Sequence, residues 1–245
     1  MAPSESAPLT PSAGRVIAVI PAFNEAESIE GVVDELVGVC PGIDYLVVND
    51  GSVDETAAVC RRRGFRLLDL PVNLGLAGAV QAGMKYAHLA GYDAVLQLDG
   101  DGQHDPRFIS PLAEALTSQD ADIVIGSRFL DQKKGRGMRM AGSRLLSGLI
   151  RVTCGARITD PTSGMRLFSR NLVGEFAWNI NYGPEPDTIA YLIRNGASVV
   201  ETPVSMRDRE AGQSYLTAFH SMVYMLNMCM SIIFVQWFRK RRESS

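Results

Sequence analysis

The sequence predicts an α/β fold with a mostly parallel central sheet flanked by helices. Short apolar runs alternate with helical stretches of about 10 to 16 residues, which is the spacing of strand–helix–strand units. Residues 16–20 (VIAVI) are continuously apolar, as expected of a strand that helices cover on both faces. Polar or acidic loops follow four successive strands, and in open α/β sheets ligands bind outside the carboxyl ends of the strands.

The elements follow from these patterns in chain order. Strands are expected at residues 15–20, 44–48, 65–70, 92–98 and 122–125, and a late strand at residues 198–204 completes or flanks the sheet. Helices are expected at residues 27–39, 54–63, 75–89, 106–118, 140–153 and 185–195. Residues 131–137 contain glycine, lysine and arginine but no apolar side chain, so a mobile loop is expected there.

The 245 residues are expected to form one domain, residues 15–215, between a disordered tail at residues 1–14 and a C-terminal helix within residues 216–245. The tail lacks the basic-then-apolar order of a signal peptide, so the cytoplasm is the expected location. The four cysteines have no metal-like spacing and are expected to be core thiols. A net charge of −3 gives no basic field, so nucleic acid is not an expected partner.

Residues 211–238 carry no Asp, Glu, Lys or Arg, and the basic cluster of residues 239–242 follows at once. Polar side chains recur along one helix face at His220, Tyr224, Asn227 and Ser231. This stripe favours a helix at the membrane interface, with the basic cluster on anionic headgroups, or a helix docked on its own domain. A membrane span and an ordinary core or oligomer helix are the alternatives.

The four strand-end loops are residues 21–25 (PAFNE), 49–52 (NDGS), 73–75 (NLG) and 99–101 (DGD). Asp99 and Asp101 flank Gly100, which allows a ligand to approach the backbone closely. Two carboxylates so near each other repel unless a cation lies between them, and Mg²⁺ or Mn²⁺ is usually held by one or two carboxylates plus substrate phosphates. Gln103 and His104 are possible further ligands, and a plain polar turn is the alternative.

Asp50 is a candidate acceptor of hydrogen bonds from a base or ribose. Its alternative role is a helix N-cap, although Ser52 or Asp54 can cap that helix without it. Asn24 and Glu25 follow the first strand and are candidate ligand residues, with complementing the helix dipole as the alternative.

Gly75 and Gly78 open a predicted helix and are candidates for cradling a phosphate at its N-terminus. Tight helix packing is the alternative for Gly78. The Gly-x-Gly-x-x-Gly dinucleotide pattern is absent from this segment.

Glu185 begins a predicted helix and stands between two prolines, a rigid arrangement that suits a positioned general base. Asp187 is the rival for that role, and both acids also complement a helix start. Arg209 precedes the uncharged C-terminal stretch, so an anion bound there would lie near a membrane surface.

Taken together, these stretches resemble the inverting family 2 glycosyltransferases with a GT-A fold, in particular the dolichol-phosphate mannose synthase-like branch. The resemblance covers about residues 15–215 and rests on the order and spacing of six segments. These are residues 20–29 (IPAFNEAESI), 48–54 (VNDGSVD), 73–75 (NLG), 97–106 (QLDGDGQHDP), 126–128 (GSR) and 160–164 (DPTSG).

The resemblance implies a Rossmann-like GT-A sheet, a nucleoside-diphosphate sugar donor, Mg²⁺ or Mn²⁺ and a polyprenyl phosphate acceptor. The nucleotide-binding residues would be Pro21, Phe23, Asn24, Glu25, Asp50, Asn73, Gly75, Gly78, Asp99 and Gly100. The metal ligands would be Asp99, Asp101 and Gln103, and the acceptor or phosphate ligands Arg128, Arg139, Ser143, Arg209 and Ser214. The chain has Asn49-Asp50 where the family often has two aspartates, and Ser214-Tyr215 where it often has Ser-Lys, so Arg207 or Arg209 would replace that lysine.

The implied reaction is displacement at the anomeric carbon of the sugar, with the metal neutralising the departing diphosphate and Asp101 among the catalytic residues. Glu185 would be needed as a base only for a hydroxyl acceptor, because a lipid phosphate is already ionised near neutral pH. The protein is expected to associate peripherally with the inner face of the membrane. A homo-oligomer is compatible with the sequence. Transfer to a saccharide acceptor is one alternative, and a non-catalytic subunit that binds a nucleotide sugar or a lipid phosphate is another. A sugar-nucleotide pyrophosphorylase is a third, but in this chain no Gly-rich, Arg-containing loop follows the first strand.

Overall fold

The computed structural model describes residues 14–131, 138–179, 183–207 and 218–235, and of residues 138, 139, 218–222 and 235 it describes the backbone only. Several sequence predictions therefore lie outside the described residues. They concern the tail, the loop after residue 131, the basic cluster of residues 239–242, Arg209, Ser214 and the side chains of Arg139 and His220.

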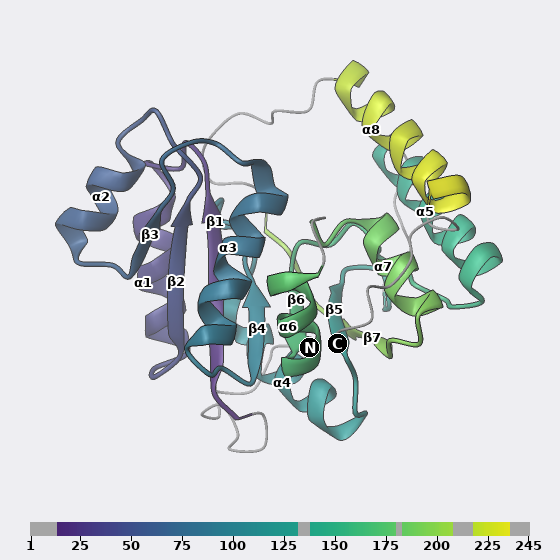
Figure 1. The fold of residues 1–245 in the computed structure, drawn as a ribbon, viewed down its shortest axis with the longest axis horizontal. Helices are drawn as coiled ribbons and strands as arrows, with labels where there is room; N and C mark the ends of the chain where they lie inside the picture. Colours follow the sequence, from purple (N-terminus) through teal and green to yellow (C-terminus); the bar gives the residue numbers. More distant parts are fainter. Residues whose placement is uncertain (1–13, 132–137, 180–182, 208–217, 236–245) are drawn as a thin grey trace.

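Seven strands form one sheet in the order β3-β2-β1-β4-β6-β5-β7 (Figure 1). Their bounds are β1 Val16–Ala22, β2 Asp44–Asn49, β3 Leu67–Asp69, β4 Ala94–Gln97, β5 Ile123–Ser127, β6 Arg166–Ser169 and β7 Val199–Pro203. All neighbouring pairs are parallel except those of β6, which runs antiparallel to both β4 and β5. The predicted mostly parallel α/β sheet is confirmed.

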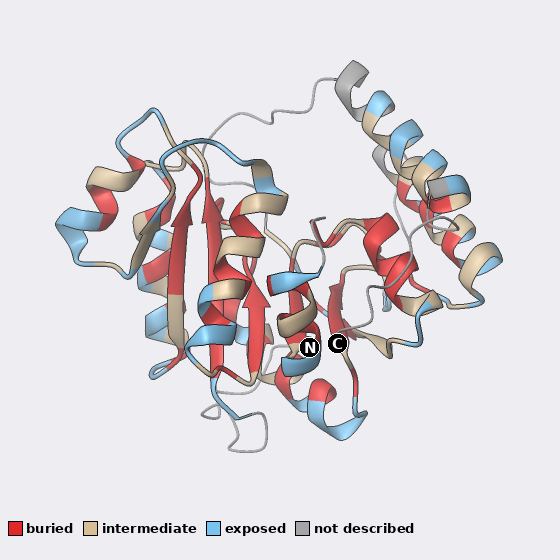
Figure 2. Ribbon diagram, viewed as in Figure 1, coloured by how far each residue is buried: buried red, intermediate tan, exposed pale blue. Residues whose placement is uncertain are grey.

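Helices cover both faces of the sheet and shield its strands from water (Figure 2). One face packs against α1 (Ile29–Val39), α2 (Thr56–Arg63) and α4 (Ile109–Ser118), which follows the short helix η2 (Pro106–Phe108). The other face packs against α3 (Gly75–Leu89), α5 (Met138–Cys154), α6 (Arg170–Trp178) and α7 (Pro186–Arg194). Alternation of side chains along each strand supplies both apolar layers, because Ile17 and Val19 belong to one and Ala18 and Ile20 to the other.

The C-terminal segment consists of α8 (Ala218–Met230) and a π-helical turn, η3 (Ser231–Val235). It lies beside α5 at one end of the molecule (Figure 1) and packs on both α5 and α7. Gly142 of α5 makes this approach possible, since a side chain there would overlap Met225 of α8. None of the helices in the described part of the chain has the length and apolar character needed to cross a membrane.

Two elements were not predicted from the sequence, β6 and α6. The apolar part of β6 is only Leu167 and Phe168, and the strand begins with the buried charge of Arg166. A short run that starts with a charged residue lacks the periodic signal of a strand, and pairing with distant strands decides its conformation. β1 also extends two residues beyond its prediction, so Pro21 pairs in the sheet opposite Val48 instead of lying in the loop.

Candidate functional site

Four predicted loops meet at one edge of the sheet because β3, β2, β1 and β4 are adjacent and parallel. Their carboxyl ends therefore point the same way, as the chain order predicted. Direct contacts join the first loop to the second, the second to the third and the fourth to the first.

The first loop is held to the second by Asn24. Its backbone adopts φ 57°, a left-handed conformation that asparagine tolerates better than most residues. The Asn24 amide N–H donates to Ser52 Oγ at 2.9 Å, and its side-chain Oδ1 accepts from the Val53 N–H at 3.0 Å. The next amide, that of Glu25, donates to Thr56 Oγ1 at 2.9 Å. Asn24 and Glu25 therefore fasten the first loop to the second.

The second loop is held to the third by Asp50, a buried carboxylate whose Oδ1 accepts from the Leu74 N–H at 2.7 Å. Gly51 has φ 65°, and a Cβ there would lie 2.5 Å from the backbone nitrogen of Asn73. Asn73 Oδ1 accepts from the Gly75 N–H at 3.0 Å and so caps the start of α3. Asn49 donates to Asp69 Oδ1 of the edge strand at 2.6 Å, so Asp50 is the member of the pair that holds the third loop.

The fourth loop lies against the first. Ser28 Oγ is 2.7 Å from the Gly100 carbonyl oxygen and 2.8 Å from Glu25 Oε2. A Cβ at Gly100 would lie 3.2 Å from the Pro21 carbonyl oxygen, so the absent side chain permits this close contact. Gly78 has a different reason, because a side chain there would overlap Leu74 within the same turn. The packing alternative for Gly78 is thus supported by its surroundings.

Asp99 and Asp101 differ in exposure. The Asp99 side chain is 35% exposed, whereas Asp101 is buried and its Oδ1 accepts from the Gln103 N–H at 3.1 Å. His104 is buried behind them; its Nδ1 accepts from the Asp99 N–H at 3.1 Å, and its Nε2 lies 3.7 Å from Asp99 Oδ2. Because Nδ1 is occupied, His104 orients the Asp99 loop and is a poor candidate for a further ligand.

Within the described residues no three His, Cys, Asp or Glu side chains lie close enough together to hold a metal ion. A hard divalent ion held by one or two carboxylates and by substrate phosphates does not need three. The partly exposed Asp99 carboxylate beside the crevice fits that kind of site. Gly164, from the segment of residues 160–164, lies so near that a side chain there would overlap the Asp99 carboxylate.

Arg128 forms a two-pronged ion pair with Asp160, with Nε–Oδ2 2.6 Å and Nη2–Oδ1 2.8 Å. Asp160 is fully buried, and its hydrogen bond raises the pKa of Arg128 above the ordinary arginine value. The predicted acceptor-phosphate ligand thus fixes the segment of residues 160–164 beside the metal candidates. The structure gives Nη1 no hydrogen bond to a described residue, whereas Nε and Nη2 are both engaged.

Arg207, proposed above as a substitute for the missing lysine, is committed elsewhere. Its guanidinium bonds both carboxylate oxygens of Glu35, at 2.9 and 2.7 Å, and lies 3.4 Å from Asp105. Its backbone pairs with Gln103, and so it secures the fourth loop from behind. Ser143 is buried on α5, next to the Gly142–Met225 contact.

The structure also reveals a buried cation that the sequence analysis did not single out. Arg166 is 3% exposed and pairs across the sheet with Gln97, just before the Asp99 loop. Its Nη2 donates to the Pro161 carbonyl oxygen at 2.8 Å, but its Nε and the Oε1 of Gln97 have no hydrogen-bond partner. Burial lowers the pKa of Arg166, while the charge of Glu185, followed by those of Asp160 and Asp99, opposes that change.

Glu185 is the N-cap residue of α7, yet its side chain makes no capping bond. Its Oε2 instead accepts a hydrogen bond from the Tyr224 hydroxyl of α8. Asp187 Oδ2 accepts from Ser231 Oγ at 2.5 Å. Gly183 lies against the first turn of α3, with a Cβ position 3.2 Å from Ala77 Cβ, so Glu185 follows a segment that packs at the mouth of the crevice.

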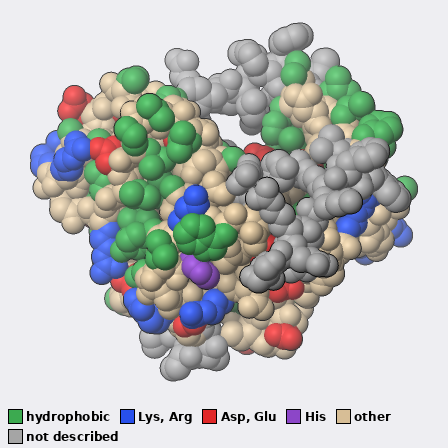
Figure 3. All heavy atoms as spheres, in the orientation of Figure 1, with side chains coloured by type: hydrophobic (Ala, Val, Ile, Leu, Met, Phe, Trp, Pro, Cys, Tyr) green, Lys and Arg blue, Asp and Glu red, His purple; other side chains and the backbone are tan. Residues whose placement is uncertain are grey.

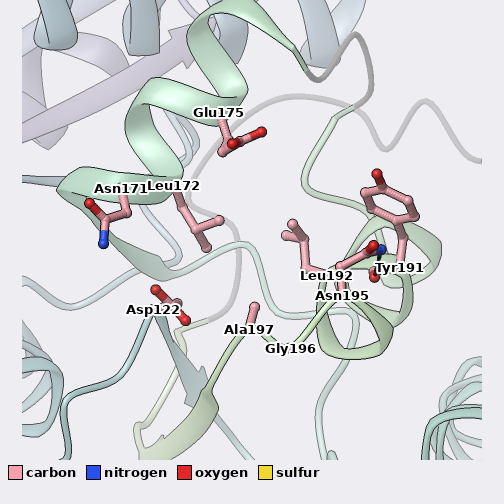
Figure 4. A pocket seen from close by; sticks show the side chains of 9 residues that line it. All are labelled: Asp122, Asn171, Leu172, Glu175, Tyr191, Leu192, Asn195, Gly196 and Ala197. Atoms are coloured by element: carbon pink, nitrogen blue, oxygen red, sulfur yellow. Dashed lines mark hydrogen bonds between the residues drawn. The ribbon is translucent and has the colours of Figure 1, made fainter. Parts of the chain in front are cut away.

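A hollow on the molecule lies away from this site (Figure 4). It is lined by Asp122, Asn171, Leu172, Glu175, Tyr191, Leu192, Asn195, Gly196 and Ala197. Asp122 and Ala197 precede β5 and β7, so the hollow is at the amino ends of these strands. In sheets of this kind the carboxyl ends bind ligands, and the four loops remain the candidate site.

Comparison with known proteins decides the family. The profile of the family described as Glycosyl transferase family 2 matches residues 17–176, which run from the second residue of β1 into the last turn of α6. This chain belongs to glycosyltransferase family 2.

Two relatives with assigned activities support this membership. A polyprenol monophosphomannose synthase of Mycolicibacterium smegmatis is 30% identical over 216 residues, 83% of this chain and 81% of its own length. An undecaprenyl-phosphate mannosyltransferase of Micrococcus luteus is 31% identical over 217 residues, 83% of this chain and 88% of its own length. The chain is therefore a glycosyltransferase.

Solved structures agree on the fold. The glucosyl-3-phosphoglycerate synthase of Mycobacterium tuberculosis, in complex with Mn²⁺, UDP and phosphoglyceric acid, superposes with a TM-score of 0.70. The match covers 94% of this chain and 81% of that one at 22% identity. At this identity the likeness concerns the GT-A fold and not the substrates.

This family 2 glycosyltransferase holds two site features that sequence reasoning missed, Arg166 and the Tyr224–Glu185 contact. Arg166 comes two positions after the segment of residues 160–164, and this closeness in sequence could have indicated that Arg166 lies near the site. Tyr224 was noted only as a member of the polar stripe. Its partner lies 39 residues away in sequence, which no local pattern specifies.

We expect Asp160→Ala to lower the free energy of unfolding of this glycosyltransferase by about 3–5 kcal/mol, because it leaves a half-buried arginine without its partner. The matched control is Arg170→Ala, which removes one side of the exposed Arg170–Asp93 ion pair and should cost about 1 kcal/mol or less. Urea unfolding followed by circular dichroism measures both. Equal losses for the two variants would contradict a structural role for the Arg128–Asp160 pair.

Proposed function

We propose that this enzyme transfers a sugar from a nucleoside-diphosphate donor to a polyprenyl phosphate, with a divalent metal and with inversion at the anomeric carbon. The observation that carries the proposal is the crevice in which the four strand-end loops bring Asp50, Asn73, Asp99 and Asp101 to one edge of the sheet. The printed activities of the relatives, a polyprenol monophosphomannose synthase and an undecaprenyl-phosphate mannosyltransferase, support the acceptor class.

Different loops are proposed to bind different parts of the donor. Asp50 and the first loop face the nucleoside, and the start of α3 at Gly75 faces the phosphates with the positive end of its helix dipole. Asp99 and Asp101 would hold Mg²⁺ or Mn²⁺, which when bound neutralises the negative charge of the leaving diphosphate. Mn²⁺ and Mg²⁺ in solved structures of the same fold support this choice of ion.

The acceptor half is proposed to use cations near α5. Arg128, through its Nη1, and Arg139 and Ser143 on α5 would bind the lipid phosphate, and Arg209 and Ser214 are proposed as further ligands from the sequence alone. A phosphate oxygen is ionised near neutral pH and attacks without losing a proton to the protein. Neither Glu185 nor Asp187 is then required as a general base.

A membrane-facing surface is proposed on α8, η3 and the adjoining α5. Exposed apolar side chains line one side of the C-terminal segment at Val223, Leu226, Met230 and Phe234, and α5 adds Leu145 and Val152. Figure 3 shows hydrophobic side chains gathered where α8 lies. Tyr224 and Ser231 point the other way, toward α7, although Asn227 of the same stripe is exposed. This arrangement supports a helix docked on its domain with an apolar face toward lipid at the inner surface of the membrane.

A thermal-shift experiment tests the donor site. UDP-glucose or GDP-mannose at saturating concentration with Mn²⁺ is expected to raise the melting temperature by about 5–10 °C, and by much less in EDTA. Asp99→Asn should abolish the metal-dependent part of the rise. Asp120→Asn is the matched control, because Asp120 is an exposed turn residue with φ 47° that asparagine also tolerates. A donor panel that shifts neither the wild type nor the control would overturn the donor assignment.

Replacement of Glu185 distinguishes the acceptor classes. With undecaprenyl phosphate as acceptor, Glu185→Gln is expected to keep turnover within about tenfold of the wild type, since no proton is abstracted. The exposed Glu114→Gln serves as the control. Product analysis with undecaprenyl phosphate and with methyl α-mannoside measures both variants. A loss of more than about a hundredfold, or turnover only with the saccharide, would favour a hydroxyl acceptor.

Vesicle binding tests the proposed lipid surface. Leu226→Asp and Phe234→Asp are each expected to weaken sedimentation with phosphatidylglycerol vesicles by about tenfold, because each removes apolar area that would leave water. Leu89→Asp on α3 changes an equally exposed leucine away from the C-terminal segment and should have no effect. If Leu89→Asp weakens binding as much as the other two, the surface is wrongly placed.

A further inference from the structure

Glu185 is held by contacts from outside its own helix. The Tyr224 hydroxyl donates to Glu185 Oε2, and burial together with the negative charge of Glu185 raises the pKa of this phenol well above its ordinary value. Tyr224 therefore remains a hydrogen-bond donor through the physiological pH range. Ser231, two helical turns farther along, bonds Asp187 at 2.5 Å and fixes the same end of α7.

The charge of Arg166 acts on the same carboxylate. Among the charged groups that interact with Arg166, Glu185 has the largest influence, and Asp160 and Asp99 follow. Arg166 therefore interacts electrostatically both with Glu185 and with Asp99, the candidate metal ligand. A buried guanidinium with an unbonded Nε is costly, and the negative charge of the neighbouring carboxylates offsets part of that cost.

Only one oxygen of the Glu185 side chain is bonded within the described part of the chain. Glu185 is half-buried, and its Oε1 has no hydrogen-bond partner among the described residues. An ionised carboxylate is purely an acceptor, so the ligand group that fits Oε1 is a hydroxyl or amine donor. The segment that leads to Glu185 packs on the first turn of α3, at the mouth of the donor crevice.

We propose that Tyr224 is a positioning residue that, together with the charge of Arg166, holds Glu185 at the wall of the donor crevice, where Glu185 accepts a hydrogen bond from a hydroxyl of the transferred sugar. The inference rests on the function proposed above. It makes the C-terminal helix a component of the active site and gives Glu185 a role in sugar selection that requires no proton transfer. Tyr224 acts through Glu185 and does not touch the reacting atoms.

A double-mutant cycle on the full-length enzyme tests this proposal, with undecaprenyl phosphate as acceptor and with GDP-mannose and UDP-glucose as donors. Tyr224→Phe is expected to reduce kcat/KM about tenfold, chiefly through KM for the donor, because a hydrogen bond to a charged group is lost. In the Glu185→Gln background the same change should cost less than about twofold, since Tyr224 acts through that carboxylate. Tyr86→Phe, which alters a partly exposed tyrosine on α3, is the control.

Discrimination between donors supplies a second measurement. If Glu185 selects the sugar, Tyr224→Phe should narrow the ratio of kcat/KM between the preferred and the poorer donor by about tenfold, whereas a simple loss of stability lowers both donors equally. Equal and additive losses in both backgrounds, with an unchanged donor ratio, would overturn the proposal. Absence of turnover by the wild type with either donor would instead count against the proposed function.

Discussion

The parallel pairing of β1 with both β2 and β4 is the constraint on which the rest of the structure depends. β1 forms six residue pairs with β2 and four with β4, so its carboxyl end lies between two others that point the same way. The first, second and fourth loops are thereby brought together before any side chain takes part. Continuous burial of β1 on both faces stabilises this register, because a slip by one residue exchanges the two apolar layers.

The side chains at this edge have structural partners as well as proposed ligands. Asp50 holds the Leu74 amide, Asn24 holds Ser52 and Val53, and Asn73 caps α3. Loops joined in this way need little ordering by a ligand, which would reduce the cost of binding the proposed donor. It also means that lost activity after substitution of Asp50 or Asn24 does not by itself identify a ligand. Asp99, with its partly exposed carboxylate, is the cleaner position for that purpose.

The sequence was most informative where a contact depends on local order. Each strand-end loop follows its own strand, so the meeting of the four loops at one edge of the sheet could be predicted from periodicity and the positions of polar residues. Arg128 was assigned to a phosphate, whereas its guanidinium is largely taken by Asp160, 32 residues away. β6 was missed because pairing with β4 and β5 overrides the weak signal of a four-residue strand. Long-range partners of this kind are set by the fold and leave no spacing pattern in the chain.

The C-terminal segment joins two tasks that the sequence presents separately. Its outward side carries Leu226 and Phe234, and its inward side carries Tyr224 and Ser231, which hold the two acids at the start of α7. Met225 packs into the gap at Gly142, directly beside Ser143 of the proposed acceptor site. With the proposed lipid contact on one side and the contacts to α5 and α7 on the other, the helix cannot move without displacing Tyr224 and Ser231. Under that proposal, membrane contact and the geometry around Glu185 would be linked energetically, in proportion to the difference in lipid affinity between the docked and undocked positions of α8.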